Sequence, residues 1–255
     1  MSTPAHRNAP GTPLDHRLSG KKTHGMMNLA LIGYGKMGRM VEQMAVARGH
    51  RVVFKVDIEG NEHGQALTKA NLEGVDVAIN FSLPPSVLQT VDRVTALGIN
   101  MVVGTTGWMG SLAEVRELVE KRGVGVVYSS NFSIGVNIFF RMVEAAAALL
   151  KEYPEYEPWV YEIHHSAKLD APSGTALKLK QILEKAYADR EIAPASNRAG
   201  ATPGTHTVGF DSEADTLTFT HTARSRLGFA TGALRAAEWV RGKKGLFEFS
   251  ETLFR

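Results

Sequence analysis

From Asn28 onward, short apolar runs alternate with amphipathic stretches of helical spacing, and this alternation limits the possible folds more than any other feature of the sequence. The helical stretches end at Gly49, Gly98 and Gly123, where a glycine is a common C-cap. The predicted strands are residues 29–32, 51–56, 75–80, 101–103 and 124–128. Strands separated by helices pair in parallel, so the pattern predicts an α/β fold with a Rossmann-type, doubly wound parallel sheet.

The first predicted strand runs directly into Gly33-Tyr34-Gly35-Lys36-Met37-Gly38, a GxGxxG turn that opens a helix. Gly33 permits the tight turn, Gly35 lets a pyrophosphate approach the backbone, and Gly38 lets the helix lie close to the strand. Asp57 ends the second strand, where an acid commonly binds the ribose of an adenine dinucleotide, although an ordinary turn residue is the alternative. Glycine-rich turns are common, but the flanking strand and helix strengthen the prediction of a dinucleotide site.

Two later turns follow the fourth and fifth strands, Gly104-Thr105-Thr106-Gly107 and Ser129-Ser130-Asn131-Phe132. Ligands of such sheets bind beyond the carboxyl ends of the strands, where both turns lie. Their small polar residues suit close approach of the backbone to a nicotinamide ribose, and simple connecting loops are the alternative.

Chemistry-bearing residues concentrate between Glu162 and Ala176, in the stretch EIHHSAKLDAPSGTA. A short apolar strand precedes it, and His164, His165 and Lys168 follow within a few residues. These groups donate protons or bind anions. A packed core histidine and a solvated lysine are the plain alternatives, at roughly even odds for any one residue alone.

The same stretch ends in a predicted anion-binding turn. Ser173, Gly174 and Thr175 follow Pro172 and open an amphipathic helix. A helix N-terminus leaves backbone N–H groups unpaired and carries about half a positive charge, so it attracts carboxylate or phosphate. The stretch therefore predicts a small polyanionic substrate.

A second, mixed domain is predicted after the long, largely buried helix 134–150. Residues 206–210 and 216–223 indicate a hairpin whose second strand places Thr216, Thr218, Thr220 and Thr222 on one face. A helix over 232–241 and a strand over 245–249 follow, and the strand could return to the first sheet. The predicted organisation is a disordered tail (1–26), a dinucleotide-binding domain (27–131, completed by 235–255) and an α+β substrate-binding and oligomerisation domain (132–234).

Composition excludes several classes of function. The basic tail accounts for the net charge of +3, which leaves the rest of the chain formally neutral and without the basic patch of a nucleic-acid binder. No apolar run is long enough to span a membrane. The absence of cysteine excludes disulfides and thiolate metal ligands and fits a cytoplasmic protein. We predict no metal site.

These motifs together closely resemble the dihydrodipicolinate reductases of the lysine pathway. That signature has Glu, a short apolar link, His-His, a spacer, Lys and then Asp-Ala-Pro-Ser-Gly-Thr-Ala, and the resemblance extends from Met27 to Arg255 through the TGALRAAEWV segment. It implies reduction of 4-hydroxy-tetrahydrodipicolinate (dihydrodipicolinate) to tetrahydrodipicolinate by NAD(P)H in lysine and diaminopimelate biosynthesis. By resemblance, both turns line the cofactor, and Asn131-Phe132 leads to the other domain. The resemblance also assigns His164 as proton donor or acceptor and Lys168 as a second donor, with substrate carboxylates held by His165, Ser173, Gly174, Thr175 and Arg235.

Cofactor preference and assembly are two further expectations. Ile58-Glu59 stands where many members of the family have a basic residue, and Asp57 with Glu59 would repel a 2′-phosphate. We therefore expect NADH to be preferred to NADPH, with Lys36 partly offsetting the effect. The flat threonine face suits contacts between sheets, so we expect the homotetramer known in the resembled family.

Two other functions stay open at this stage. Another two-domain amino-acid or hydroxy-acid dehydrogenase would share the first domain but would not need the His-His-Lys turn. A dinucleotide-sensing protein would bind the cofactor without turnover.

Overall fold

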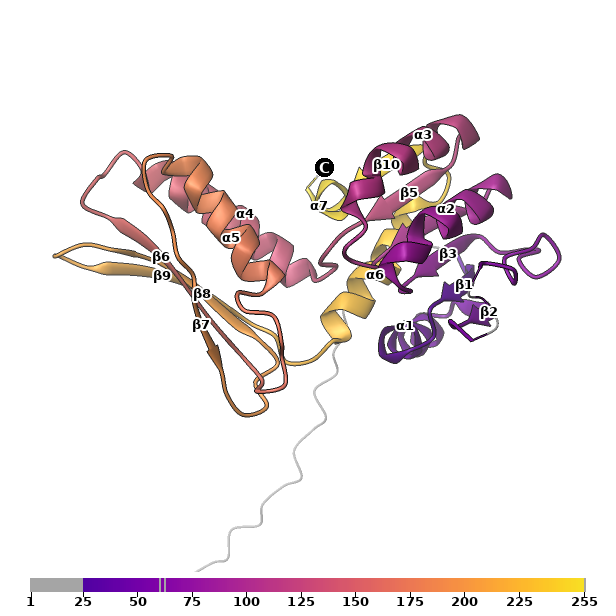
Figure 1. Cartoon of the computed structure of the whole chain (residues 1–255), viewed down its shortest axis with the longest axis horizontal. Helices are drawn as coiled ribbons and strands as arrows, with labels where there is room; N and C mark the ends of the chain where they lie inside the picture. The colour runs from indigo at the N-terminus through magenta and orange to yellow at the C-terminus, as the bar shows by residue number, and fades with distance from the viewer. Residues whose placement is uncertain (1–24, 60, 62, 255) are drawn as a thin grey trace, which may run out of the picture.

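The computed structural model describes residues 25–59, 61 and 63–254, so nearly all of the predicted tail lies outside the described residues. Two sheets, each flanked by helices, form two domains (Figure 1). The first domain contains β1 (Asn28–Ile32), α1 (Lys36–Ala47), β2 (Arg51–Val56), β3 (Val77–Asn80), η1 (Pro84–Ser86), α2 (Val87–Ala96), β4 (Asn100–Val103), η2 (Met109–Ser111), α3 (Leu112–Arg122), β5 (Gly125–Tyr128), α6 (Leu227–Val240), β10 (Gly245–Glu248) and α7 (Phe249–Leu253). The second contains α4 (Ile134–Leu150), β6 (Glu157–His164), α5 (Gly174–Ala186), β7 (Ala195–Arg198), β8 (Thr205–Asp211) and β9 (Thr216–Thr222).

The first sheet confirms the predicted doubly wound parallel fold. Its order is β10-β5-β4-β3-β1-β2, and every neighbouring pair is parallel. The short strands β3, β4 and β5 are almost wholly buried because helices cover both faces of the sheet. The strand order reverses between β1 and β3, and at such a point the carboxyl ends of the strands open a crevice for a ligand.

The C-terminal segment returns to this first sheet, as predicted, but it returns earlier than expected. Helix α6 begins at Leu227, not at Gly232, and its Ala230, Ala233 and Ala237 are fully buried in the core beside α1 and β1. Gly228 and Gly232 weaken the local helical signal, and packing on the sheet overrides it. We therefore place the return to the first domain at about residue 227 rather than at residue 235.

The second sheet has the order β7-β6-β8-β9, and α4 and α5 cover one of its faces (Figure 1). The register places Thr205 opposite Thr222 and Thr207 opposite Thr220 on the other face, which confirms the predicted threonine-rich surface. On that face the ring of Trp159 lies against Gly209, where a Cβ would stand 2.1 Å from the ring. Strand β7 was not predicted.

Helix α4 has the predicted bounds but is buried on one side only. Val136, Phe139 and Val143 face the core, whereas Met142 and Leu149 are exposed. Within the described residues, no helix combines the length and the apolar character that crossing a bilayer would require.

Candidate active site

The glycine turn after β1 is held by its neighbours in the sheet. The Gly33 N–H donates to the carbonyl of Val56 at 2.8 Å. Gly33 has φ +88°, and a Cβ there would lie 2.2 Å from the carbonyl oxygen of Phe81, so only glycine fits. A Cβ on Gly38 would lie 2.4 Å from the Gly33 carbonyl oxygen, whereas one on Gly35 would meet open space. The turn therefore packs through Gly33 and Gly38 and leaves the backbone at Gly35 accessible, as a bound pyrophosphate requires.

A cavity of about 430 Å³ opens at this turn. Six residues of the predicted cofactor set line it, namely Gly35, Lys36, Met37, Gly104, Thr105 and Thr106. Phe81, Ser82 and Arg226 also line it and were not predicted. The cavity lies where the strand order reverses, and its glycine turn fits the pyrophosphate of a dinucleotide.

The far side of the turn is more cationic than the sequence suggested. Lys55 and Arg39 both pack against the ring of Tyr34, at 4.7 Å and 5.6 Å from its centroid. Tyr34 donates its hydroxyl hydrogen to Glu42, which also binds Lys55 at 3.0 Å. Asp57 is exposed beyond β2 and accepts the N–H of Ile58 at 2.9 Å, so its carboxylate stays beside the strand end.

The crossover from β5 to α4 ties the two domains together through Asn131. The Asn131 Nδ2 donates to Thr175 Oγ1 at 3.4 Å, while its carbonyl accepts from Asn137 at 2.9 Å. Phe132 is buried against Phe249, and its carbonyl leaves no room for a side chain at position 232. The crossover thus connects the nucleotide-binding domain directly to the start of α5.

A fully buried carboxylate, Glu162, lies at the centre of the second domain's polar cluster. Its Oε1 accepts hydrogen bonds from Ser173 N at 2.9 Å, Ser196 Oγ at 2.8 Å and Arg198 at 2.9 Å. Burial alone would raise the pKa of Glu162, but the Ser173 side chain and these hydrogen bonds outweigh it and lower the pKa to about 2. The cluster therefore contains a permanently ionised carboxylate at neutral pH.

Two buried histidines face the other oxygen of this carboxylate. His164 Nδ1 lies 3.4 Å and His206 Nε2 3.3 Å from Glu162 Oε2, and the two rings meet edge to face. Burial lowers the pKa of His164, with the positive charges of Lys168 and Arg198 acting in the same direction and Glu162 opposing them. Burial, reinforced by His164, lowers the pKa of His206 to about 4. At neutral pH, His206 is therefore an uncharged imidazole.

The N-terminus of α5 is attached to the same carboxylate. Ser173 caps the helix, since its Oγ accepts from Ala176 N at 3.2 Å and its own N–H is held by Glu162. The N–H groups of Gly174 and Thr175 have no hydrogen-bond partner among the described residues. A Cβ on Gly174 would meet open space. This end of the helix is therefore free to bind an anion.

Lys168 and His165 flank the cluster on an exposed turn. Lys168 Nζ binds the carboxylate of Asp170 at 2.8 Å, a partner that was not predicted, and its N–H donates to the His165 carbonyl at 3.1 Å. The ion pair lowers the pKa of Asp170. The sequence-predicted residues His164, Lys168, Ser173, Gly174 and Thr175 thus come together around Glu162.

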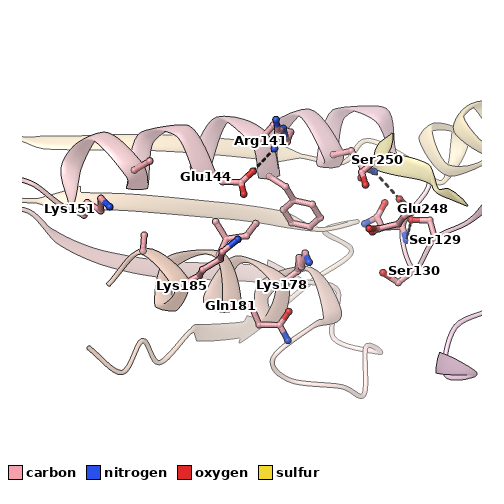
Figure 2. A pocket seen from close by; sticks show the side chains of 16 residues that line it. Ser129, Ser130, Arg141, Glu144, Lys151, Lys178, Gln181, Lys185, Glu248 and Ser250 are labelled. Carbon is pink, nitrogen blue, oxygen red and sulfur yellow. Dashed lines mark hydrogen bonds and ion pairs between the residues drawn. The ribbon is translucent and has the colours of Figure 1, made fainter. Parts of the chain in front are cut away.

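A larger cavity of about 550 Å³ lies between α4 and α5 (Figure 2). Lys178 and Lys185 project into it from α5, and Arg141 of α4 is paired there with Glu144 at 2.7 Å. From the predicted cofactor set, Ser129, Ser130 and Asn131 line this cavity rather than the one at the glycine turn. Neither His164 nor Lys168 lines it, so it is not the centre of the His164 cluster.

Glu162, His164 and His206 also place possible metal-ligand atoms within 4.8 Å of one another. Three donors already occupy Glu162 Oε1, and one of them is the Arg198 guanidinium at 2.9 Å. A cation would be repelled by this neighbouring positive charge. This charge supports the prediction of no metal site, which stays a prediction.

Family models match almost all of the described chain. "Dihydrodipicolinate reductase, N-terminus" matches residues 27–132, and "Dihydrodipicolinate reductase, C-terminus" matches residues 135–253. The chain belongs to the dihydrodipicolinate reductase family. The two models meet at the crossover through Asn131, where the structure changes from the first sheet to α4.

Individual relatives agree with this membership. The 4-hydroxy-tetrahydrodipicolinate reductase of Christiangramia forsetii is 40% identical over 238 residues, which cover 89% of this chain and 98% of the relative. The enzyme of the same name from Cupriavidus necator is 34% identical, with coverage of 89% and 99%. A dipicolinate-bound dihydrodipicolinate reductase from Paenisporosarcina has the same fold, with a TM-score of 0.76 at 22% identity over 88% of this chain and 98% of that one.

Arg235 is the predicted substrate residue that the structure leaves apart from the cluster. It lies on the exposed side of α6 in the first domain, and no hydrogen bond or ion pair joins it to the described residues around Glu162. The residues missed by sequence reasoning are Glu162, Ser196, Arg198 and His206 in the cluster, with Phe81, Ser82 and Arg226 at the cavity. For Glu162, its place at the start of the family signature was the signal that could have identified it as a site residue.

Proposed function

We propose that the protein reduces 4-hydroxy-tetrahydrodipicolinate to tetrahydrodipicolinate with a hydride from NADH or NADPH. The observation that supports this proposal most is that the hydrogen bond from Asn131 to Thr175 links the nucleotide-binding domain, which holds the glycine-turn cavity, to the open N-terminus of α5 beside the His164–Lys168 cluster. Both of the curated relatives described above bear this enzyme's name. A ligand with two carboxylates matches the cationic and N–H-rich surroundings of the cluster.

The chain's residues divide the work of the reaction. When bound, the nicotinamide supplies the hydride. The free N–H groups at Gly174 and Thr175 hold a substrate carboxylate, because the helix N-terminus is positive. The Lys168 ammonium stabilises the negative charge that develops on the ring, and His164 exchanges the proton. His165 borders the same turn and contributes to carboxylate binding.

The glycine-turn cavity holds the dinucleotide in this proposal. Gly35 and Lys36 contact its pyrophosphate, Asp57 its adenosine ribose, and the turn at 104–106 its nicotinamide half. The 129–132 turn lies beyond this cavity, and the nicotinamide end would have to extend toward it. We propose a preference for NADH because Asp57 and Glu59 are exposed at the end of β2. The nearby Lys55 does not cancel this charge, since it is already paired with Glu42 at 3.0 Å.

We also propose that the protein is a homotetramer assembled through the open face of the second sheet. Helices cover only one face, and the other presents Trp159, which is 36% exposed, beside the threonine rows. A flat surface of threonine and aromatic side chains suits packing against a second sheet.

The decisive experiment measures substrate-dependent oxidation of NADH and NADPH by the purified protein. Product freshly made by dihydrodipicolinate synthase serves as substrate, and a His164→Gln variant serves as the control for non-enzymatic oxidation. We expect turnover with this substrate and none with simple amino or hydroxy acids. Cofactor binding without turnover would refute the proposal and favour a dinucleotide-sensing protein.

A further inference from the structure

The orientation of Glu162 is fixed before any substrate binds. Its Oε1 is saturated by a backbone N–H, a hydroxyl and a guanidinium, from Ser173, Ser196 and Arg198. The side chain is 0% exposed, and burial without solvent leaves it no other arrangement that keeps these three bonds. Its Oε2 therefore points permanently at the two histidines.

Glu162 Oε2 and His164 Nδ1 are both buried and form no hydrogen bond of good geometry, yet they face each other at 3.4 Å. An unprotonated Nδ1 would face the carboxylate oxygen as a second acceptor and leave both buried atoms without a donor, so a hydrogen on Nδ1 is favoured. Catalytic hydrogen bonds are often long in the free enzyme and tighten when the substrate binds.

His206 does not take up the whole of Glu162 Oε2. Its Nδ1 is buried without a hydrogen-bond partner, so a neutral His206 carries its hydrogen on Nε2, which lies 3.1 Å from Ser173 Oγ and 3.3 Å from Glu162 Oε2. A carboxylate oxygen accepts about two hydrogen bonds, so Oε2 keeps room for a hydrogen on His164 Nδ1.

The opposite edge of the His164 ring lies against Gly204. A Cβ at this position, where φ is +144°, would stand 2.8 Å from His164 Nε2. Glycine at position 204 therefore puts no side chain of its own against Nε2. The two ring nitrogens therefore differ, with Nδ1 against a fixed carboxylate and Nε2 beside a residue that has no side chain.

We propose that Glu162 is a positioning residue that holds His164 with its hydrogen on Nδ1, so that Nε2 is the atom that exchanges a proton with the substrate. This inference deepens the proposed function and rests on it. The charged and titratable groups that face His164 from the packed elements are Glu162, Lys168, Asp170, Arg198 and His206.

Replacing the Glu162 carboxylate should change the pKa of His164 in a defined direction. Glu162 raises the pKa of His164 against the lowering effect of burial, so Glu162→Gln lowers that pKa further. If protonated His164 delivers the proton, kcat falls at high pH as His164 loses its proton. This fall moves to lower pH in the variant. We expect kcat to fall by about 10² and the KM for NADH to stay unchanged.

The test reads the tautomer directly in the ¹⁵N-labelled full chain without ligands. Long-range ¹H–¹⁵N spectra at about pH 8 show neutral imidazoles, and His164→Gln identifies the His164 signals. We expect the wild type to show His164 protonated at Nδ1, Glu162→Gln to show a mixture of tautomers, and Ser196→Ala to resemble the wild type. Ser196→Ala is the matched control because it removes one bond to Oε1 and leaves the charge in place.

Protonation of wild-type His164 at Nε2 would overturn the inference, even if Glu162→Gln failed to fold. So would a folded Glu162→Gln with an unchanged tautomer and pH profile. A wild type that shows the Nδ1 hydrogen but does not turn over the dicarboxylate would refute the proposed function and leave the positioning of His164 intact.

Discussion

We expect His206 to make the stability of the second domain sensitive to mild acid. It is 5% exposed, and its pKa is lowered from the usual 6.5 to about 4. A depressed histidine pKa favours the neutral form in the folded state. Its contribution is therefore fully present above about pH 6.5, the value for the unfolded chain, and is lost as the pH falls toward 4.

The size of the effect follows from the two pKa values. The interval from 6.5 to about 4 corresponds to about 3 kcal/mol of unfolding free energy, of which about 2 kcal/mol is lost by pH 5. We expect His206→Gln to remove this contribution, because an amide hydrogen-bonds within the cluster but does not take up a proton. The variant's stability should therefore fall less steeply with acidification than that of the wild type.

Urea unfolding at several pH values from about 7 to 4 provides the measurement, with hydrogen exchange of peptides from β6 and β8 locating the change in the second sheet. His63→Gln, at an exposed histidine in the first domain, is the matched control and should follow the wild type. Parallel curves for His206→Gln and the wild type across this interval would refute the reasoning.

Other perturbations separate the remaining roles. His164→Gln should lower kcat by about 10², whereas Thr175→Ala should chiefly raise the substrate KM; steady-state kinetics with the pattern reversed would contradict the division of roles. The value of kcat/KM should be higher for NADH than for NADPH, and a tenfold advantage for NADPH, about 1.4 kcal/mol, would refute the charge argument at Asp57 and Glu59. EDTA should leave turnover unchanged, and loss of activity restored by a divalent metal would contradict the prediction of no metal site. Light scattering should show a tetramer that Trp159→Glu weakens; a monomeric wild type at micromolar concentration would exclude the assembly.

The first domain was predictable because its signals are local. Periodic apolar runs, helix-ending glycines and the glycine turn after residue 32 each depend on a few neighbouring residues, and together they imply the parallel sheet. Helix α6 was placed too late because its glycines carry no helical preference. Its burial comes from strands β1 to β5, which lie far earlier in the sequence, between Asn28 and Tyr128.

The polar cluster was only half predictable. The signature supplied His164, Lys168 and the start of α5, which lie close together in sequence. Arg198 reaches the cluster from β7. The sequence of this strand, Ala-Ser-Asn-Arg, has no strand-like alternation, and the strand forms because it pairs with β6. The register of β6 with β8 sets Glu162 opposite His206, and no local pattern encodes this pairing.

The return of α6 and β10 to the first sheet has a consequence for synthesis on the ribosome. The second domain, 134–222, is continuous in sequence, whereas the first sheet lacks its edge strand and α6 until residues beyond 227 have emerged. Domains generally fold as units during synthesis. The second domain can therefore fold first. Until α6 has emerged, the earlier half of the first domain exposes the apolar surface that α6 later covers. Leu29, Leu31 and Val41, which share a core cluster with α6 in the folded domain, belong to that surface.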